Sequence, residues 1–141
     1  MFKKILLSTD GSGYAEQEVD RVTDLIAEDG EIIILSVAGK LTSSAFQSRK
    51  KIKKVNQVLK KEAETAVANM AKLFDPSLNV RTMVLTGFPA ETINQVAVDE
   101  DVDLIVISSS GKSGLHKFII GSVAEKVLKN AEKDVLLVHN S

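Results

Sequence analysis

The 141-residue chain carries 18 basic and 19 acidic side chains, a formal net charge of −1, and no cysteine. This charge balance gives no overall field that would attract nucleic acid or an anionic membrane, and the lack of cysteine excludes disulfides, thiolate metal sites and cysteine nucleophiles. The length and a hydrophobic fraction of 44% fit one domain spanning residues 1–141. We expect a soluble cytoplasmic protein, because no apolar run is long enough for a signal-peptide core or a membrane span.

Five short apolar runs predict β-strands, and segments with helical spacing of apolar residues lie between them. The runs are mostly continuous rather than alternating, which is typical of strands covered on both faces. The predicted strands are 5–7, 32–37, 80–85, 104–107 and 135–138, and the predicted helices are 12–28, 48–74, one starting at Pro89 and one starting at Gly121-Ser122. This alternation predicts an α/β fold: a single doubly wound, Rossmann-like domain with a five-stranded parallel sheet. The strand order that we expect for such a domain is 3-2-1-4-5.

The first predicted strand ends in Ser8-Thr9-Asp10, and a helix is expected to follow. We expect Ser12 to cap that helix, because a serine oxygen accepts hydrogen bonds from first-turn N–H groups. In doubly wound sheets, ligands bind at the carboxyl ends of the strands where the strand order reverses. If the first and fourth strands are neighbours there, Asp10 and the loop after the fourth strand face one crevice. The residues alone leave open whether this carboxylate binds a ligand hydroxyl or a cation.

The segment from Ser108 to Ser122 carries the strongest functional signal. It is rich in serine and glycine, follows a buried apolar run and precedes a helix start. Small residues in such a place expose backbone N–H groups at the positive end of a helix dipole, which is typical of phosphate sites. Gly121-Ser122 alone is also consistent with a simple helix cap, but the serine- and glycine-rich loop before it favours the phosphate site.

Other patterns in the chain are weaker indications of function. Gly111-Lys112-Ser113 is similar to the end of a Walker A loop, but Val106 stands where that motif requires its first glycine. The basic run 49–54 keeps helical spacing of its apolar residues, which favours a solvated helix face over nucleic-acid binding. His116 and His139 have no second ligand at metal-site spacing, so a structural metal is not expected.

Three motifs match those of a known family. Residues 3–12 resemble a first-strand signature that ends in Asp-Gly-Ser, and Gly87-Phe88-Pro89 resembles a Gly-x-Pro turn before the third helix. Near the end, Gly111 fits the second glycine of the pattern Gly-x-x-Gly, nine residues, then Gly-Ser/Thr, which Gly121-Ser122 closes. On these motifs the chain resembles the universal stress protein family over essentially its whole length, and within it the ATP-binding branch.

The resemblance implies an adenine nucleotide alpha hydrolase-like fold that binds ATP between the first and fourth strands, commonly with Mg²⁺ or Mn²⁺. It places Asp10 at the ribose and Val37 at the adenine, and it assigns the phosphates to the serine- and glycine-rich loop and the last helix start. The residues so implied at the nucleotide are Ser8, Thr9, Asp10, Val37, Ser108, Ser109, Ser110, Gly111, Lys112, Ser113, Gly114, Gly121, Ser122 and Val123. Members commonly form homodimers through their last strands, here Val135, Leu136, Leu137 and Val138.

Two residues depart from the family pattern. Ser108 stands in place of the first motif glycine, and Ser8 stands where proline is usual. If position 108 requires a positive φ, serine there costs about 1 kcal/mol or somewhat more; if it requires only space near the ligand, Ser108 is neutral. Ser8 in place of proline removes some rigidity under the adenine pocket.

The leading hypothesis is an ATP-binding universal stress protein that acts as a nucleotide-dependent stress-response regulator or switch. We expect slow or absent hydrolysis, because the sequence supplies phosphate donors without an evident general base. The alternative is a non-nucleotide-binding dimeric interaction module, and a third hypothesis is a slow metal-dependent ATPase. The sequence does not identify the protein partner or the inducing stress, and it leaves open ATP against AMP or another adenine nucleotide.

Overall fold

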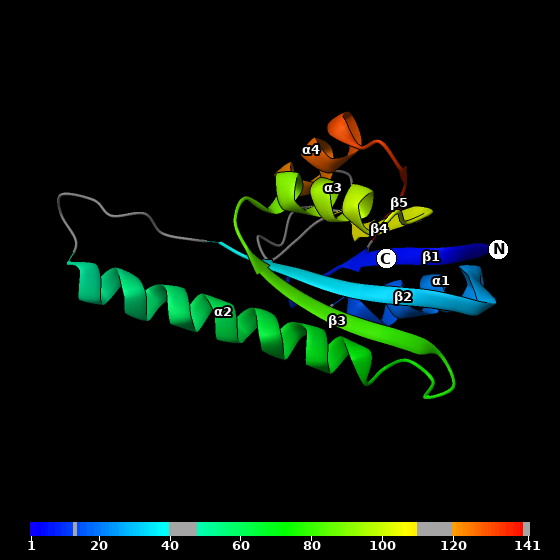
Figure 1. Ribbon diagram of the computed structural model, residues 1–141, viewed down its shortest axis with the longest axis horizontal. Coiled ribbons are helices and arrows are strands. Elements are labelled where there is room, and N and C mark those ends of the chain that lie inside the picture. Colours follow the sequence, from blue (N-terminus) through cyan, green and yellow to red (C-terminus); the bar gives the residue numbers. More distant parts are fainter. Residues whose placement is uncertain (13, 40–47, 110–119, 140–141) are drawn as a thin grey trace.

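One parallel sheet of five strands organises the chain (Figure 1). The computed structural model describes residues 1–12, 14–39, 48–109 and 120–139. In chain order the elements are β1 (Phe2–Ser8), α1 (Ala15–Leu25), β2 (Ile26–Ala38), α2 (Arg49–Ala71), β3 (Asn79–Thr86), α3 (Pro89–Asp99), β4 (Leu104–Ser108), α4 (Ser122–Asn130) and β5 (Asp134–Val138). The strand order is β3-β2-β1-β4-β5 with parallel pairings throughout, so the predicted fold class and strand order are confirmed.

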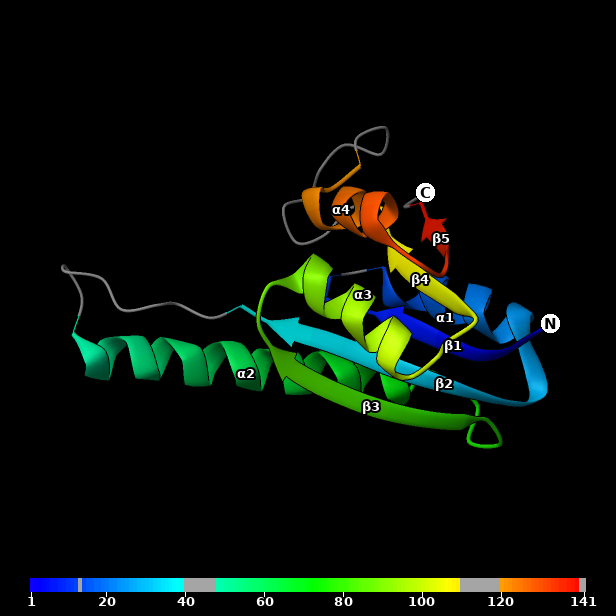
Figure 2. The same ribbon diagram turned by 45° about the horizontal axis from the view of Figure 1, so that its top comes forward.

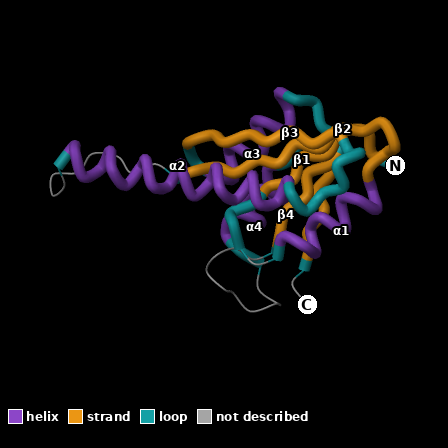
Figure 3. Tube along the Cα trace, turned by 90° about the horizontal axis from the view of Figure 1, so that it is seen from below, coloured by secondary structure: helices purple, strands orange, loops and turns teal. Residues whose placement is uncertain are grey.

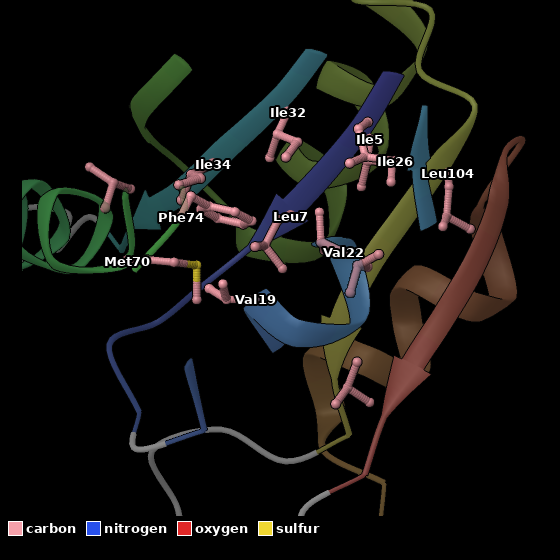
Figure 4. Close-up of a cluster of buried hydrophobic side chains, with 13 residues drawn as sticks. Ile5, Leu7, Val19, Val22, Ile26, Ile32, Ile34, Met70, Phe74 and Leu104 are labelled. Carbon is pink, nitrogen blue, oxygen red and sulfur yellow. The ribbon is translucent and has the colours of Figure 1, made fainter. Parts of the chain in front are cut away.

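Helices cover both faces of the sheet, α1 and α2 on one and α3 and α4 on the other (Figures 1 and 2). Because side chains alternate along a strand, each central strand contributes to two cores. In β1, Ile5 and Leu7 pack with Val22 on the α1 and α2 side, whereas Leu6 packs with Ile93 on the α3 and α4 side. The first core, drawn in Figure 4, also contains Val19, Ile34, Met70 and Phe74.

The start of α1 differs from the prediction that Ser12 caps it. The N-cap residue is Tyr14, whose side chain makes no capping hydrogen bond. The Ser12 backbone N–H donates instead to Asp10 Oδ1 at 2.9 Å, and Gly11 has a φ of 83°. An aspartate side chain therefore closes the loop before the helix, and this turn leaves Ser12 ahead of the first helical residue.

The end of α1 also differs from the predicted helix 12–28. Ile26 has an extended backbone, with φ −75° and ψ 138°, and it begins β2, where it pairs with Phe2 of β1. Ile26 is buried in this strand and would equally have been buried on the apolar side of a longer helix. Apolar spacing alone therefore does not locate the end of the helix.

The starts of α2 and α3 follow the sequence signals. Ser48 is the N-cap of α2, and its side chain accepts a hydrogen bond from the Lys51 N–H at 3.2 Å. Pro89 lies in the first turn of α3, where its missing N–H would have had no intrahelical partner.

The N-terminal half of α2 extends past the sheet (Figures 1 and 3). In its basic run 49–54 every side chain is exposed except that of Ile52, as expected for a solvated helix face.

Of the helices within the described ranges, none is long and apolar enough to cross a membrane.

Gly87 makes the turn from β3 to α3 in a conformation that favours glycine. Its φ is 156°, its N–H donates to the Ala38 carbonyl at 3.0 Å, and a Cβ there would lie 3.0 Å from Thr92 Oγ1. We expect Gly87→Ala to lower the free energy of unfolding by about 1–2 kcal/mol. Gly39→Ala is the matched control, because a Cβ at Gly39 would meet nothing within 4 Å. Urea unfolding of both variants checks this, and equal midpoints would contradict it.

Candidate functional site

A cavity of about 230 Å³ lies at the carboxyl edge of the sheet. It opens where β1 and β4 are neighbours, because the chain leaves β1 toward α1 on one face and reaches α4 on the other (Figure 2). Such a reversal of strand order leaves a crevice between the two connections. The lining residues are Ser8, Thr9, Asp10, Glu18, Val37, Pro89, Ile93, Ile107, Ser108, Ser109, Gly121, Ser122, Val123 and Ala124.

All of the predicted nucleotide-site residues that the structure describes line this cavity. They are Ser8, Thr9, Asp10, Val37, Ser108, Ser109, Gly121, Ser122 and Val123. The remaining predicted residues, Ser110, Gly111, Lys112, Ser113 and Gly114, lie outside the described residues. Residues that are distant in the sequence therefore meet at one place, which is the edge that the strand order had indicated.

The loop after β1 is held in place by hydrogen bonds to its backbone. The Thr9 N–H donates to the Leu35 carbonyl of β2 at 2.9 Å, and Thr9 Oγ1 accepts from the Gly11 N–H at 3.2 Å. Asp10 closes the following turn through the Ser12 N–H. The side chain of Asp10 is exposed and borders the cavity, so its carboxylate lies at the cavity mouth.

The backbone of Ser109 connects β5 to the start of α4. Its N–H donates to the Val138 carbonyl at 2.9 Å, and its carbonyl accepts from the Gly121 N–H at 2.7 Å. Gly121 is the N-cap of α4 and has no side chain to cap the first turn. Because the first N–H groups of a helix lack intrahelical acceptors, the donors available to an anion here begin at Ser122.

Ser108, which replaces the first motif glycine, has an ordinary strand backbone. It ends β4 and pairs with Val138 of β5. Among the described residues other than glycine, only Asp101 has a positive φ, at 50°. Serine at position 108 therefore carries no left-handed backbone strain, and its effect on the site is limited to what its side chain does in the cavity.

The sequence reasoning missed Glu18 as a cavity residue. Glu18 lies on α1, its side chain is 2% exposed, and its Oε2 atom has no hydrogen-bond partner. A signal was present in the sequence, because Glu18 is spaced three residues after Ala15 and four before Val22, on the apolar side of the helix. The other missed lining residues are apolar and are typical of a core: Pro89, Ile93, Ile107 and Ala124.

A second, wider hollow of about 640 Å³ lies between the loop after β1 and α2. Thr9 and Asp10 border both hollows, and Lys61 and Asn69 of α2 contribute to the second. No other predicted site residue lies among the described residues that line it. The cavity between β1 and β4 is therefore the candidate site.

Comparison with known proteins identifies the family. The sequence profile of the universal stress protein family matches residues 1–139. This chain belongs to the universal stress protein family. The resemblance noted in the motifs is thereby confirmed at the level of the family.

Relatives of this universal stress protein are similar over most of their lengths. Universal stress protein MJ0577 of Methanocaldococcus jannaschii is 33% identical over an alignment covering 98% of this chain and 95% of the relative. Its solved structure has a TM-score of 0.78 and covers 100% of this chain and 98% of its own. Universal stress protein MJ0531 of the same organism is 31% identical, covering 98% of this chain and 82% of the relative.

A more distant structure shares the fold. It is that of a universal stress protein from Archaeoglobus fulgidus in complex with dAMP, with 19% identity and a TM-score of 0.61 over 97% of each chain.

Two acids determine the electrostatics of the described part of the cavity in this universal stress protein. Asp10 and Glu18 are the only ionisable side chains among the described residues that line it. Burial, and secondarily the Asp10 carboxylate, raises the pKa of Glu18 from 4.5 to about 8. At neutral pH, Glu18 is therefore a neutral acid and the described lining carries one negative charge.

We expect the folded protein to lose stability as pH rises from 4.5 to about 8. In this interval the unfolded chain releases the Glu18 proton while the folded chain retains it. The free energy of unfolding therefore falls as pH rises, and it levels off above about pH 8. The difference between the two pKa values corresponds to at most about 5 kcal/mol. Glu18→Gln should remove this slope and stabilise the protein above about pH 8.

Urea unfolding across this pH range measures the effect. Glu16→Gln is the matched control, because Glu16 lies on the same turn of α1 but is exposed. The control should keep the wild-type slope. A wild-type slope in Glu18→Gln as well would show that Glu18 is not the titrating group.

Proposed function

We propose that this universal stress protein binds ATP in the cavity between β1 and β4 and acts as a nucleotide-dependent stress-response regulator or switch with little or no hydrolysis. The observation that carries the proposal is the meeting of nine predicted site residues around one cavity at the strand-order reversal. The dAMP complex of the Archaeoglobus fulgidus member, which has the same fold, supports an adenine nucleotide as the ligand class.

The described side chains suit the parts of such a ligand. The exposed Asp10 carboxylate accepts hydrogen bonds and fits the hydroxyls of a ribose. Val37 and Ile93 give an apolar surface for a base. The first turn of α4, from Ser122, offers unpaired N–H groups at the positive end of the helix dipole, which fits phosphate.

The protonation state of the cavity supports the proposed weak hydrolysis. Activation of water requires an unprotonated base within reach. Burial keeps Glu18 protonated at neutral pH, so it does not serve as this base, and the one remaining carboxylate in the described lining, that of Asp10, is assigned to the ribose rather than to the phosphates. Metal-dependent turnover abolished by Asp10→Ala would instead favour the slow ATPase hypothesis.

We propose that a divalent cation binds at this site together with the nucleotide. The described residues contain no group of three or more histidine, cysteine or acidic side chains that would hold a metal ion. Mg²⁺ bound with ATP takes most of its oxygen ligands from phosphates and water, so such a site needs few protein ligands.

The affinity for ATP should respond to charge at Gly121. Aspartate and asparagine are both favourable N-cap residues and similar in size, so Gly121→Asp and Gly121→Asn should both keep α4 folded. Only aspartate places a negative charge beside the phosphates. We expect isothermal titration of nucleotide-stripped protein with ATP and Mg²⁺ to give micromolar binding, weaker by about tenfold or more in Gly121→Asp than in Gly121→Asn.

Two results would contradict this. Equal affinities of the Gly121→Asp and Gly121→Asn variants would place the phosphates elsewhere. Absence of binding in the wild type would reject ATP as the ligand and favour the dimeric interaction module.

We also propose a homodimer formed through β5. This strand is at an edge of the sheet, with β4 as its one neighbour in the described fold. The other edge of β5 has no partner strand in the described fold, and its residues Val135, Leu136 and Leu137 are half-buried. Both features suit pairing with a second copy. Light scattering on the purified protein should give twice the 15.3 kDa of one chain, and a monomeric mass would contradict the proposal. The cytoplasmic location stays a prediction from the sequence.

A further inference from the structure

Glu18 is a buried acid whose role the proposed function leaves open. Its side chain is 2% exposed and lines the cavity, and Oε2 has no hydrogen-bond partner. Burying a polar atom without a partner destabilises a fold, so such atoms are usually satisfied by a ligand or by water. The place of Glu18 at the candidate site makes a ligand the natural partner.

A second unpartnered atom borders the same cavity. Ser109 is 1% exposed, and its Oγ has no partner although both of its backbone groups are hydrogen-bonded. Among the described residues, the only other buried side-chain atom of this kind is Asn94 Oδ1, and Asn94 does not line the cavity. Unsatisfied polar atoms therefore gather at this cavity from two different parts of the chain, α1 and the residue that follows β4.

The surroundings of Glu18 determine which hydrogen-bonding group it offers. From the loop after β1, Asp10 acts on it with a like charge. The charged residues of α2 at this end, Lys61 and Glu62, border the neighbouring hollow, and β4, β5, α3 and α4 bring no ionisable side chain to the described lining. Burial holds Glu18 as the neutral acid, which has one O–H donor, and the nearby Asp10 carboxylate adds to this effect because no cation stands beside Glu18 in the described lining.

We propose that Glu18 is a ligand-contacting residue of this cavity, which donates a hydrogen bond from its neutral carboxyl group to an acceptor atom of the bound adenine nucleotide. The inference rests on the proposed function. It adds to that site a contact between Glu18 and the nucleotide, and it requires Glu18 to be protonated when the nucleotide binds. A deprotonated Glu18 has no donor and, together with Asp10, repels the phosphates. The cavity therefore selects a ligand that has a hydrogen-bond acceptor facing Glu18, and Glu18 keeps its proton in the complex.

The dissociation constant of ATP with Mg²⁺, measured by isothermal titration at about pH 7.5 and about pH 9.5, tests the proposal. Because the pKa of Glu18 is about 8, we expect wild-type binding to weaken about tenfold or more between these values. Glu18→Gln keeps a neutral donor of the same size, so this variant should bind as well as the wild type at the lower pH. Its dissociation constant should change less than about threefold between the two pH values. The exposed Glu16→Gln control should follow the wild type.

Proton uptake gives an independent readout. At about pH 8, where Glu18 is half ionised, binding should draw about half a proton into the wild-type complex and none into Glu18→Gln. Titrations in two buffers of different ionisation enthalpy measure this difference. Adenosine as a second ligand locates the contact: a pH effect with ATP alone assigns the acceptor to the phosphates, and an effect with both assigns it to the nucleoside.

Several results would overturn the inference while leaving the proposed function intact. One is a wild-type affinity for ATP that does not change with pH, and another is an equal loss of affinity at high pH in Glu18→Gln. A third is binding that tightens at high pH, which would mean that the carboxylate is the binding form. Failure of every variant to bind ATP at either pH is a different outcome, because it rejects the proposed function itself.

Discussion

The pairing of β1 with β4 is the constraint on which the rest of the molecule depends. Ile5, Leu6 and Leu7 of β1 pair in parallel with Leu104, Ile105 and Val106 of β4, and all of them are buried. Parallel neighbours require crossover connections, and here the connection from β1 covers one face while that from β4 covers the other. The two connections must diverge at the carboxyl edge, so the cavity is a consequence of topology rather than of any particular side chain.

The described walls of this cavity would hold an anion with backbone groups rather than with basic side chains. The opening turn of α4 supplies unpaired N–H donors and the positive end of a dipole, equivalent to about half an elementary charge. This partial charge is small beside the full charge of Asp10, so a second full negative charge in the described lining would add strongly to the repulsion of an anion. The neutrality of Glu18 at physiological pH is therefore part of what makes the cavity compatible with phosphate.

The fold was predictable because its signals are local. Continuous apolar strands, the cap at Ser48 and the proline at Pro89 each determine an element without reference to the rest of the chain. The predictions were wrong where alternatives are locally equivalent. Ser12 was expected to cap α1, but its N–H donates to the Asp10 side chain in a turn before the helix, and Ile26 is buried in either conformation. The burial of Glu18 arises from the packing of α1 over β1 and β4, which no local pattern quantifies.

The placement of Tyr14 gives the molecule a built-in optical probe. It is the one tyrosine of a chain without tryptophan, so the intrinsic ultraviolet emission of the protein originates from a single phenol ring. That residue caps α1, and its carbonyl accepts the Glu18 N–H at 3.2 Å, within the turn that carries the buried acid. Rearrangement of this turn therefore changes the environment of the only strong fluorophore, so the fluorescence of Tyr14 in the unlabelled protein responds to changes beside the cavity.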